Sequence, residues 1–412
     1  MLSVRDTEAI ILNLVQPLED TEVVDLLAAA GRILATHVIS KLDFPHWDNS
    51  AMDGYAVRFE DVQNCSEEVP KILEIVEEIP AGYQPKSTIQ PGQAARIFTG
   101  AVIPQGADTV IMQEKTRREA NRVFILAAAK PQEFVRRKAS YYQSGTQLLP
   151  AGIILNAPEI AVLAAAQCAE VSVYRRPKVA IFSTGDELVT PDKPLQPGQI
   201  VDSNQYALAA LVRQSGGEPL ILGIVKDEPI TLQETIAQAI INADIVISSG
   251  GVSVGDYDYV DKILESLGAK IHIQSVAMRP GKPLTVASLL TPHSSLYFGL
   301  PGNPAAVLVT FWRFVQPAIK KLAGISAGWE VKFVKVRSHD ELRSDGKRET
   351  YVWGRLQLID GVYEFHQAGG SHSSGNLINL AQTNALAVLR VGTTLISAGE
   401  EVEVLKIYSN FH

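Results

Sequence analysis

The sequence predicts a multidomain fold of α/β plus β class: a central doubly wound α/β domain, an N-terminal helical region with an inserted β-rich module, and a C-terminal β domain. Strand-like and helix-like patterns alternate from residue 177 to about 323, which is typical of a mostly parallel sheet covered on both faces. Short β-type runs separated by Gly and Pro fill residues 47–140, and similar runs follow residue 328 without helices between them. The expected domains are 1–46 with 141–176, 47–140, 177–325 and 326–412.

The composition is that of a folded chain. Hydrophobic residues make up 46% and charged residues 20% of the 412 positions, which excludes wholesale disorder, collagen-like repeats and a coiled coil. The 37 basic and 45 acidic residues give a formal net charge of −8, so a general nucleic-acid binder is not expected. No apolar run approaches the ~20 residues that span a bilayer. Two distant cysteines exclude a disulfide framework, and we expect a cytoplasmic protein that binds neither membrane nor nucleic acid.

The N-terminal region is expected to be helical. Apolar residues recur at helical spacing after Asp6, and a second helix is expected from Asp20 to a stop near Gly31. Asn156 is a suitable N-cap for a third helix, because Pro158 is tolerated in the first turn. The inserted module is expected to contain strands at 72–76, 94–98, 109–112 and 123–126.

The alternating region has a pattern of strands and helices. Strands are expected at 178–183, 219–225, 244–248, 270–276 and 295–299, and helices at 205–215, 229–242, 258–267 and 304–322. The C-terminal domain is expected to contain strands at 331–337, 349–358, 362–365, 385–389 and 401–406.

A loop rich in serine and glycine follows the expected strand at 244–248 and carries the strongest functional signal. Its residues are Ser249, Gly250, Gly251, Ser253 and Gly255. Glycines let the backbone approach an anion, and the helix that follows directs free N–H groups and the positive end of its dipole toward it. Open α/β sheets bind ligands at this end of their strands. The alternative is a tight turn without a ligand, which the serines and the neighbouring carboxylates make the weaker interpretation.

Carboxylates also lie near the ends of three expected strands, at Glu187, Asp227 and Asp258. Each one alone is typical of an acid that caps a helix. Together they offer hard oxygen ligands, which suit Mg²⁺ bound to one or two carboxylates and to phosphate oxygens. We therefore favour a site for Mg²⁺ and a phosphorylated ligand.

Two further segments can bind an anion. Arg279 and Lys282 enclose a rigid Pro-Gly turn, and although surface cations are usually solvated, the prolines fix this backbone. Pro301 and Asn303 precede the long helix expected at 304–322, where free N–H groups are available. The sequence has no His-Glu-x-x-His, Gly-x-Ser-x-Gly or Cys-x-x-Cys motif, so the chemistry must come from carboxylates, cations, backbone N–H groups and a metal.

Six ordered motifs closely resemble the MoeA family of molybdopterin molybdenumtransferases, to which the C-terminal domain of gephyrin is related. The resemblance covers nearly the whole chain. It implies insertion of molybdenum from molybdate into adenylylated molybdopterin, with Mg²⁺-dependent loss of AMP, by a homodimer whose active sites are shared between subunits. The motifs are Ser50-Ala51-Met52-Asp53-Gly54-Tyr55-Ala56, Arg96-Ile97-Phe98-Thr99-Gly100-Ala101, Ser183-Thr184-Gly185-Asp186-Glu187-Leu188, the loop at 249–255, Pro280-Gly281-Lys282-Pro283 and Gly299-Leu300-Pro301-Gly302-Asn303-Pro304.

The resemblance also implies roles for individual residues. Asp53 and Thr99 would reach the site of the partner subunit, and Lys282 would help to hold molybdate or phosphate. Glu187, Asp227 and Asp258 would be the acidic site residues, and their carboxylates would bind Mg²⁺. The substrate would also contact Ser249, Gly250, Gly251, Ser253, Gly255, Arg279, Pro301, Asn303, Arg348 and Ser374. A molybdopterin adenylyltransferase is a possible partner.

The chain departs from the family pattern on the side that would bind the oxyanion. Tyr141 replaces an aspartate, Ser275 a lysine, Ala306 a serine and Trp353 an arginine. Arg348, Arg355 and Ser374 are candidates to compensate. The losses motivate an alternative, a divergent carrier or scaffold that holds molybdopterin without inserting metal. Adenylation of molybdopterin is a third possibility, against which the additional N-terminal and C-terminal domains argue.

Overall fold

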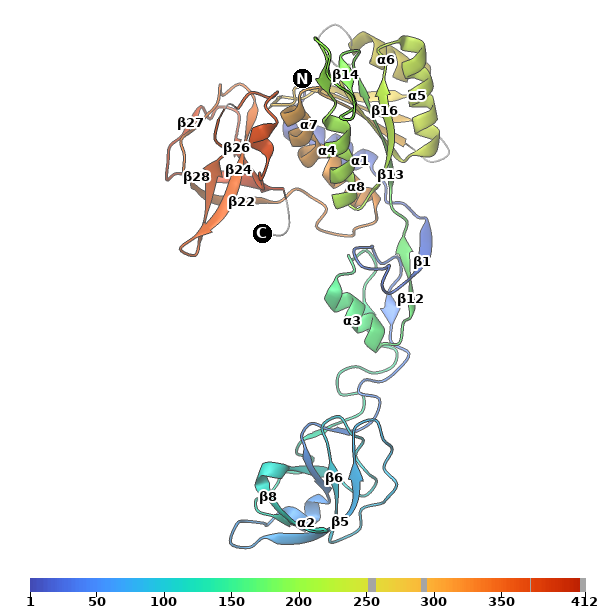
Figure 1. Ribbon diagram of the computed structural model, residues 1–412, viewed down its shortest axis with the longest axis vertical. Helices are drawn as coiled ribbons and strands as arrows, with labels where there is room; N and C mark the ends of the chain where they lie inside the picture. The colour runs from blue at the N-terminus through green and yellow to red at the C-terminus, as the bar shows by residue number, and fades with distance from the viewer. Residues whose placement is uncertain (251–256, 290–294, 371, 408–412) are drawn as a thin grey trace. The chain divides into compact units, whose positions relative to one another are not determined.

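The computed structural model describes residues 1–250, 257–289, 295–370 and 372–407 (Figure 1). Contacts between residues divide the chain into two units. The first unit consists of Met1–Thr36, Ala151–Ala161 and Ala169–His412, and the second of His37–Pro150 and Val162–Cys168. Among the described residues, no helix has both the length and the apolar character that crossing a membrane would require.

The central sheet of the first unit has six strands in the order β16-β13-β17-β21-β20-β18. Its first four strands are parallel, β20 runs antiparallel to both of its neighbours, and β18 therefore runs in the same direction as the first four, so the predicted mostly parallel sheet is present. The strand β20 was not predicted, because the prolines before it indicate a turn; proline is tolerated at the first position of a strand. The bounds are β13 Lys178–Thr184, β16 Glu218–Val225, β17 Ile245–Ser249, β18 Lys270–Ser275, β20 Pro283–Leu289 and β21 Ser295–Leu300.

Helices cover both faces of this sheet, as the doubly wound pattern predicts. In β13, Ile181 packs in one apolar cluster with Leu208 of α4, whereas Phe182 packs in a second cluster with Ile236 of α5. The helix expected at 304–322 is continuous, but Phe311–Val315 forms a π-helical turn within it. The helices are α1 Val4–Leu14, α4 Asn204–Gln214, α5 Pro229–Asn242, α6 Tyr257–Ser266, α7 Pro304–Thr310 and α8 Gln316–Leu322.

The second N-terminal helix is a wrong prediction. Thr21–Asp25 instead forms strand β1, which pairs antiparallel with β12 (Glu170–Tyr174). Leu27, which falls within the expected helix, is 93% exposed. The segment contains Thr21, Val23 and Val24, and branching at Cβ favours a strand where a partner strand is available. Helices α1 and α3 (Ala157–Ala165) are present as expected.

The second unit is built around a six-stranded sheet with the order β7-β4-β6-β5-β9-β8. Tyr55 and Ala56 of β4 lie in different apolar clusters, so both faces of the sheet are covered. The strands expected from the sequence are present. The bounds are β4 Gly54–Val57, β5 Lys71–Ile79, β6 Gln93–Ile97, β7 Thr109–Met112, β8 Thr116–Glu119 and β9 Arg122–Ile125, with the helix α2 Phe59–Val62 and the short strands β2 Val38–Ile39, β3 Asn49–Ser50, β10 Val135–Arg136 and β11 Gln147–Leu149.

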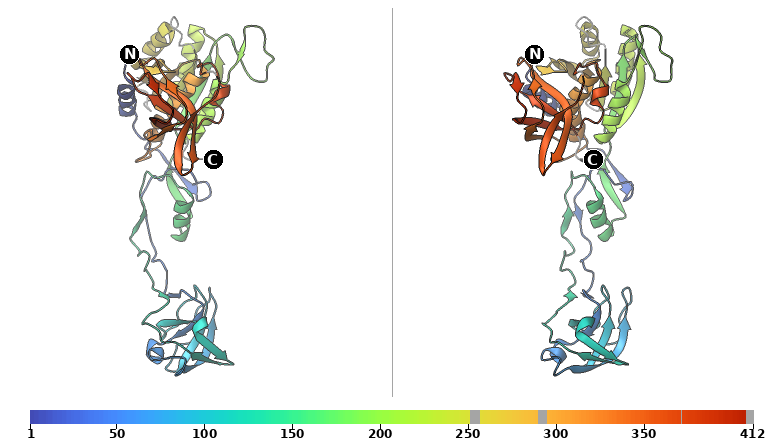
Figure 2. Two further views of the ribbon diagram at one scale, coloured as in Figure 1. Left: turned by 90° about the vertical axis from the view of Figure 1, so that its left-hand side faces the viewer. Right: turned by 60° about the vertical axis from the view of Figure 1, so that its left-hand side comes forward.

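The C-terminal strands, coloured orange to red in Figure 2, form a closed barrel within the first unit. The sheet order is β24-β25-β22-β28-β26, and a direct pairing of β26 with β24 closes it. Val352, Phe365 and Val404 pack in its core. The strand β19 (Met278–Arg279) of the α/β region pairs with β24 at Glu349 and Thr350. The bounds are β22 Phe333–Ser338, β24 Glu349–Ile359, β25 Val362–Gln367, β26 Ala385–Leu389 and β28 Glu401–Lys406, with the short strands β14 Leu188–Val189, β15 Ile200–Val201, β23 Leu342–Arg343 and β27 Leu395–Ile396.

Candidate active site

A cleft of about 1380 Å³ lies in the first unit, where the parallel strands end. Thr184 at the end of β13 and Ser249 at the end of β17 line its floor. The barrel contributes Arg348 and Trp353 to the same cleft. The position agrees with the general rule that open α/β sheets bind ligands beyond the carboxyl ends of their strands.

The structure brings most of the predicted site residues into this cleft. Those that line it are Glu187, Asp227, Ser249, Gly250, Arg279, Lys282, Pro301, Asn303, Arg348 and Ser374. Gly251, Ser253 and Gly255 lie outside the described residues. Asp258 belongs to the first turn of α6, but its side chain is also outside the described part of the structure.

Gly250 begins the serine/glycine loop in a conformation that requires glycine. Its φ is +92°, and a Cβ atom at this position would lie 2.3 Å from the carbonyl oxygen of Thr184. The backbone of Gly250 therefore lies against the end of β13, and the absence of a side chain allows this close approach.

Asn204, at the start of α4, connects two loops of the cleft. Its Nδ2 donates hydrogen bonds to Oγ of Ser249, at 2.8 Å, and to the carbonyl oxygen of Gly302, at 2.7 Å. Sequence reasoning missed Asn204, because it began the helix at residue 205 and assigned no role to the residues before it. The signal was a polar run directly after a strand, at a helix start.

Asp202 is a second cleft residue that sequence reasoning missed. It is 2% exposed, and its Oδ1 accepts hydrogen bonds from the backbone N–H groups of Asn204, at 3.0 Å, and Gln205, at 3.3 Å. Its Oδ2 is buried and has no hydrogen-bond partner among the described residues. Buried carboxylate oxygens are normally satisfied, so this oxygen is available to a bound ligand or cation.

The cleft is also lined by four basic side chains, those of Arg279, Lys282, Arg343 and Arg348. Asp345 lies near two of these side chains, with its Oδ2 at 3.6 Å from Nη1 of Arg279 and 3.9 Å from Nη2 of Arg348. The backbone N–H of Lys347, followed by the charges of Arg348 and Arg279, lowers the pKa of Asp345. The pairing of β19 with β24 brings the arginines of two domains to the same cleft.

At four positions this chain has a residue that differs from the family pattern, and two of these four residues line the cleft. Ala306 and Trp353 line the cleft, and the Trp353 ring centroid lies 5.0 Å from that of His372. Ser275, in β18, pairs with Pro283 and is not among the lining residues. Tyr141 belongs to the second unit, with its ring 5.7 Å from that of Phe44.

Of the candidates for compensation, Arg348 and Ser374 line the cleft, but Arg355 does not. Arg355 Nη2 instead donates a hydrogen bond to Oε1 of Gln382. Arg355 also lies opposite His366 on the next strand of the barrel. The structure therefore does not bring Arg355 to the cleft with the other two candidates.

Asp53 and Thr99 form a pair within the second unit. Oδ1 of Asp53 accepts hydrogen bonds from the backbone N–H of Thr99, at 2.8 Å, and from its hydroxyl, at 2.7 Å. These bonds lower the pKa of Asp53, the backbone N–H of Thr99 having the largest effect. The motifs at 50–56 and 96–101, which are separate in the sequence, thus meet at the ionised carboxylate of Asp53.

The fold and the cleft define a class of protein: a multidomain α/β protein that presents oxygen donors and cations around the carboxyl ends of its strands. Three family models match, described as the MoeA N-terminal region (domain I and II) at residues 2–166, a probable molybdopterin binding domain at 180–321 and the MoeA C-terminal region (domain IV) at 335–407. The chain belongs to the MoeA family of molybdopterin molybdenumtransferases.

Similar proteins cover nearly the full chain. A molybdopterin molybdenumtransferase from Nostoc sp. is 75% identical over 410 residues, which are 99% of this chain and 94% of the relative. One from Haemophilus influenzae is 35% identical and covers 93% of both chains. The crystal structure of a molybdopterin biosynthesis MoeA protein from Pyrococcus horikoshii has a TM-score of 0.84 at 28% identity, covering 100% of both chains.

Proposed function

We propose that this protein is a transferase of molybdenum cofactor biosynthesis, which inserts molybdenum from molybdate into adenylylated molybdopterin and releases AMP. The 75% identity to the Nostoc molybdopterin molybdenumtransferase, over 99% of the chain, carries this proposal. The same comparison does not favour a carrier without metal insertion, because the relatives over nearly the full length are transferases.

We assign Mg²⁺ to the carboxylates of the cleft on the chemistry of their donor atoms. Glu187, Asp227 and Asp202 all line the cleft and offer only oxygen ligands, the donor type that Mg²⁺ requires. The unpartnered Oδ2 of Asp202 supports this assignment. Asp258 is proposed as a further ligand. When bound, Mg²⁺ would offset the charge of the phosphates and polarise the bond that releases AMP.

The remaining cleft residues position the substrate. Arg279, Lys282 and Arg348 can hold molybdate or phosphate oxygens through charge-assisted hydrogen bonds. Gly250, which carries no side chain, lets the substrate approach the backbone, and Ser249, Pro301, Asn303 and Ser374 also line the cleft. Because these groups are fixed by the fold, little reorganisation is needed when charge develops during cleavage.

The test is AMP release by the purified protein with adenylylated molybdopterin, molybdate and Mg²⁺. We expect release that depends on molybdate and falls at least tenfold in Lys282→Met. The matched control is Lys335→Met, which removes an exposed lysine paired with Glu401 at 3.0 Å. Tight binding of the pterin with unchanged nucleotide would establish the carrier instead, and consumption of ATP with free molybdopterin would establish adenylation.

We also propose that the protein forms a homodimer with shared active sites. The protein would act as a homodimer, in which Asp53 and Thr99 of one subunit serve the cleft of the other, and it would receive its substrate from a molybdopterin adenylyltransferase. The family resemblance supports this arrangement. The ionised state of Asp53 suits a role beside a cation or a protonated group.

A further inference from the structure

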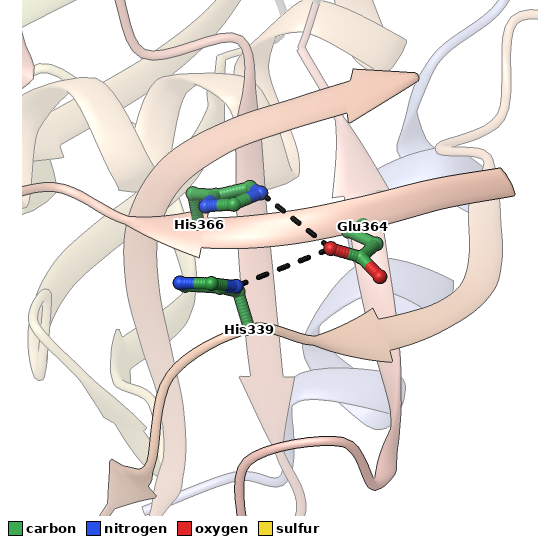
Figure 3. Close-up of side chains that lie close together, drawn as sticks. All are labelled: His339, Glu364 and His366. Carbon is green, nitrogen blue, oxygen red and sulfur yellow. Dashed lines mark ion pairs between the residues drawn. The ribbon is translucent and has the colours of Figure 1, made fainter. Parts of the chain in front are cut away.

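Two histidines and a glutamate come together on the barrel, outside the cleft. Glu364 and His366 are two residues apart in β25, so both point to the same face, and Phe365 between them packs in the barrel core. His339 follows β22, and its backbone N–H donates to the carbonyl oxygen of Phe365 at 2.8 Å. Two neighbouring strands therefore place the three side chains together on the outer surface (Figure 3).

The possible ligand atoms of the three side chains lie within 4.8 Å of one another. Oε2 of Glu364 is 4.0 Å from Nδ1 of His339 and 3.8 Å from Nε2 of His366. A tetrahedral ion with ligand bonds of about 2.0–2.1 Å needs its ligand atoms about 3.3 Å apart. A small contraction would satisfy this spacing. The His339 side chain is 59% exposed, and its ring stacks on that of His366 with the centroids 4.3 Å apart, so the two imidazoles already lie side by side.

The cluster also contains an unsatisfied nitrogen. Nε2 of His366 is buried and has no hydrogen-bond partner among the described residues, although it faces the Glu364 carboxylate. A buried polar atom without a partner costs free energy. A cation bound between Nε2 and the carboxylate would satisfy both atoms.

Neighbouring cations limit the affinity of such a site. Arg337 lies opposite Glu364, and Arg355 lies opposite His366, so both arginines are on the same outer face. The cluster itself contributes one negative charge. The three protein ligands also leave positions for water, so we expect binding at micromolar rather than nanomolar concentrations.

We propose that His339, Glu364 and His366 bind a divalent transition-metal ion of the Zn²⁺, Co²⁺ or Ni²⁺ type. Two imidazoles and one carboxylate suit these ions, whereas Mg²⁺ and Ca²⁺ prefer oxygen ligands alone. None of the three residues lines the cleft, so the site goes beyond the proposed transferase activity. It is the one group of His, Cys, Asp and Glu side chains, among the residues described, that has this close spacing.

The experiment titrates the full-length protein with Co²⁺ and then displaces it with Zn²⁺, following the visible absorption of bound Co²⁺. An excess of Mg²⁺ occupies the carboxylates of the cleft, so that the signal reports a site containing nitrogen ligands. We expect one saturable site, weakened at least tenfold in His339→Ala, Glu364→Gln and His366→Gln. Two control variants should bind as the unmodified protein does: Glu401→Gln, in the same barrel, and His272→Gln, whose Nε2 lies 2.8 Å from Oγ of Ser288.

The result that overturns the proposal is the absence of saturable Co²⁺ binding, or equal affinity in the unmodified protein and in His339→Ala. His339 is exposed, so its replacement tests the site even if replacing the partly buried His366 disturbs the fold. Thermal unfolding without metal checks that each variant is folded. No substrate is present, so the outcome is independent of the transferase activity.

Discussion

Asn204 is the residue whose side chain has the clearest positioning role in the cleft. Replacing it by alanine removes the hydrogen bonds to Ser249 and to the carbonyl of Gly302. Each such bond stabilises by about 1 kcal/mol, so we expect the loss of both to lower AMP affinity, measured by calorimetry, by up to about thirtyfold. The control is Asn242→Ala, which removes one bond to the carbonyl of Gln238 in α5. Equal AMP affinity in the two variants would contradict the role.

Gly250 permits a test of the close approach between the loop and β13. We expect Gly250→Ala to lower the free energy of unfolding by about 3 kcal/mol, since it combines an unfavourable φ with a clash against Thr184. Gly216→Ala is the matched control: its φ is +90°, and nothing lies within 4 Å of the added Cβ. It should cost about 1 kcal/mol in the same denaturation experiment. A similar cost for both variants would show that the contact with Thr184 is unimportant.

Site residues could be predicted where they lie in motifs next to strand ends, because those ends meet in space. Glu187, Ser249 and Lys282 are examples, and each lines the cleft. Asp202 could not be found in this way, since a carboxylate before a helix is usually a cap; only the folded chain shows its buried, unpartnered Oδ2. Arg348 lines the cleft and Arg355 does not. This difference depends on how β24 pairs with its neighbours, which the spacing of the two arginines in the sequence does not give.

At the scale of elements, a buried ion pair connects α1 to the π-helical turn. Arg313 is 3% exposed and donates to both carboxylate oxygens of Glu8, at 2.6 and 2.9 Å, and to the hydroxyl of Tyr351, at 3.0 Å. Burial alone would lower the pKa of Arg313, but the interactions with Glu8 and Tyr351 together outweigh it and raise that pKa. Arg313 therefore stays charged at all ordinary pH values.

We expect Glu8→Ala to destabilise the fold by about 3 kcal/mol, because it leaves the Arg313 charge buried without its carboxylate. Glu60→Ala is the comparison, since Glu60 pairs with Arg58 at 2.5 Å while being 73% exposed. It should cost less than about 1 kcal/mol. Chemical denaturation of the two variants measures the difference, and similar losses would contradict the structural role of Glu8.

Elements with strong local signals agree with their predictions, whereas the element whose predicted type is wrong, β1, depends on a distant partner. Helix α5 has the predicted bounds, Pro229–Asn242, because proline at its start and a regular apolar spacing act locally. Strand β1 was predicted as a helix because its partner β12 lies far along the chain. Closure of the barrel is likewise not encoded in any one segment, since it depends on the pairing of β24 with β26.

At the scale of the whole molecule, the proposed sharing of active sites can be tested by mixing two inactive variants. Asp53→Asn and Asp227→Ala should each abolish most AMP release. Asparagine is well tolerated in a turn, so the fold at position 53 should be retained. After subunit exchange, half of the dimers are mixed and each has one intact site, so about a quarter of the activity should return. Mixtures that stay inactive after confirmed exchange would contradict the shared site.

The pairing of β19 with β24 has a consequence for how this protein can be divided. Met278 and Arg279 come immediately before the basic turn, and they lie opposite Glu349 and Thr350 of the barrel in the strand pairing. A fragment that ends before the barrel would lose Arg343 and Arg348 from the cleft and would expose an unpaired strand edge beside Lys282. The barrel therefore cannot be gained or lost as an independent accessory domain, and recombination between homologues should preserve residues 278–279 and 349–350 as a matched set.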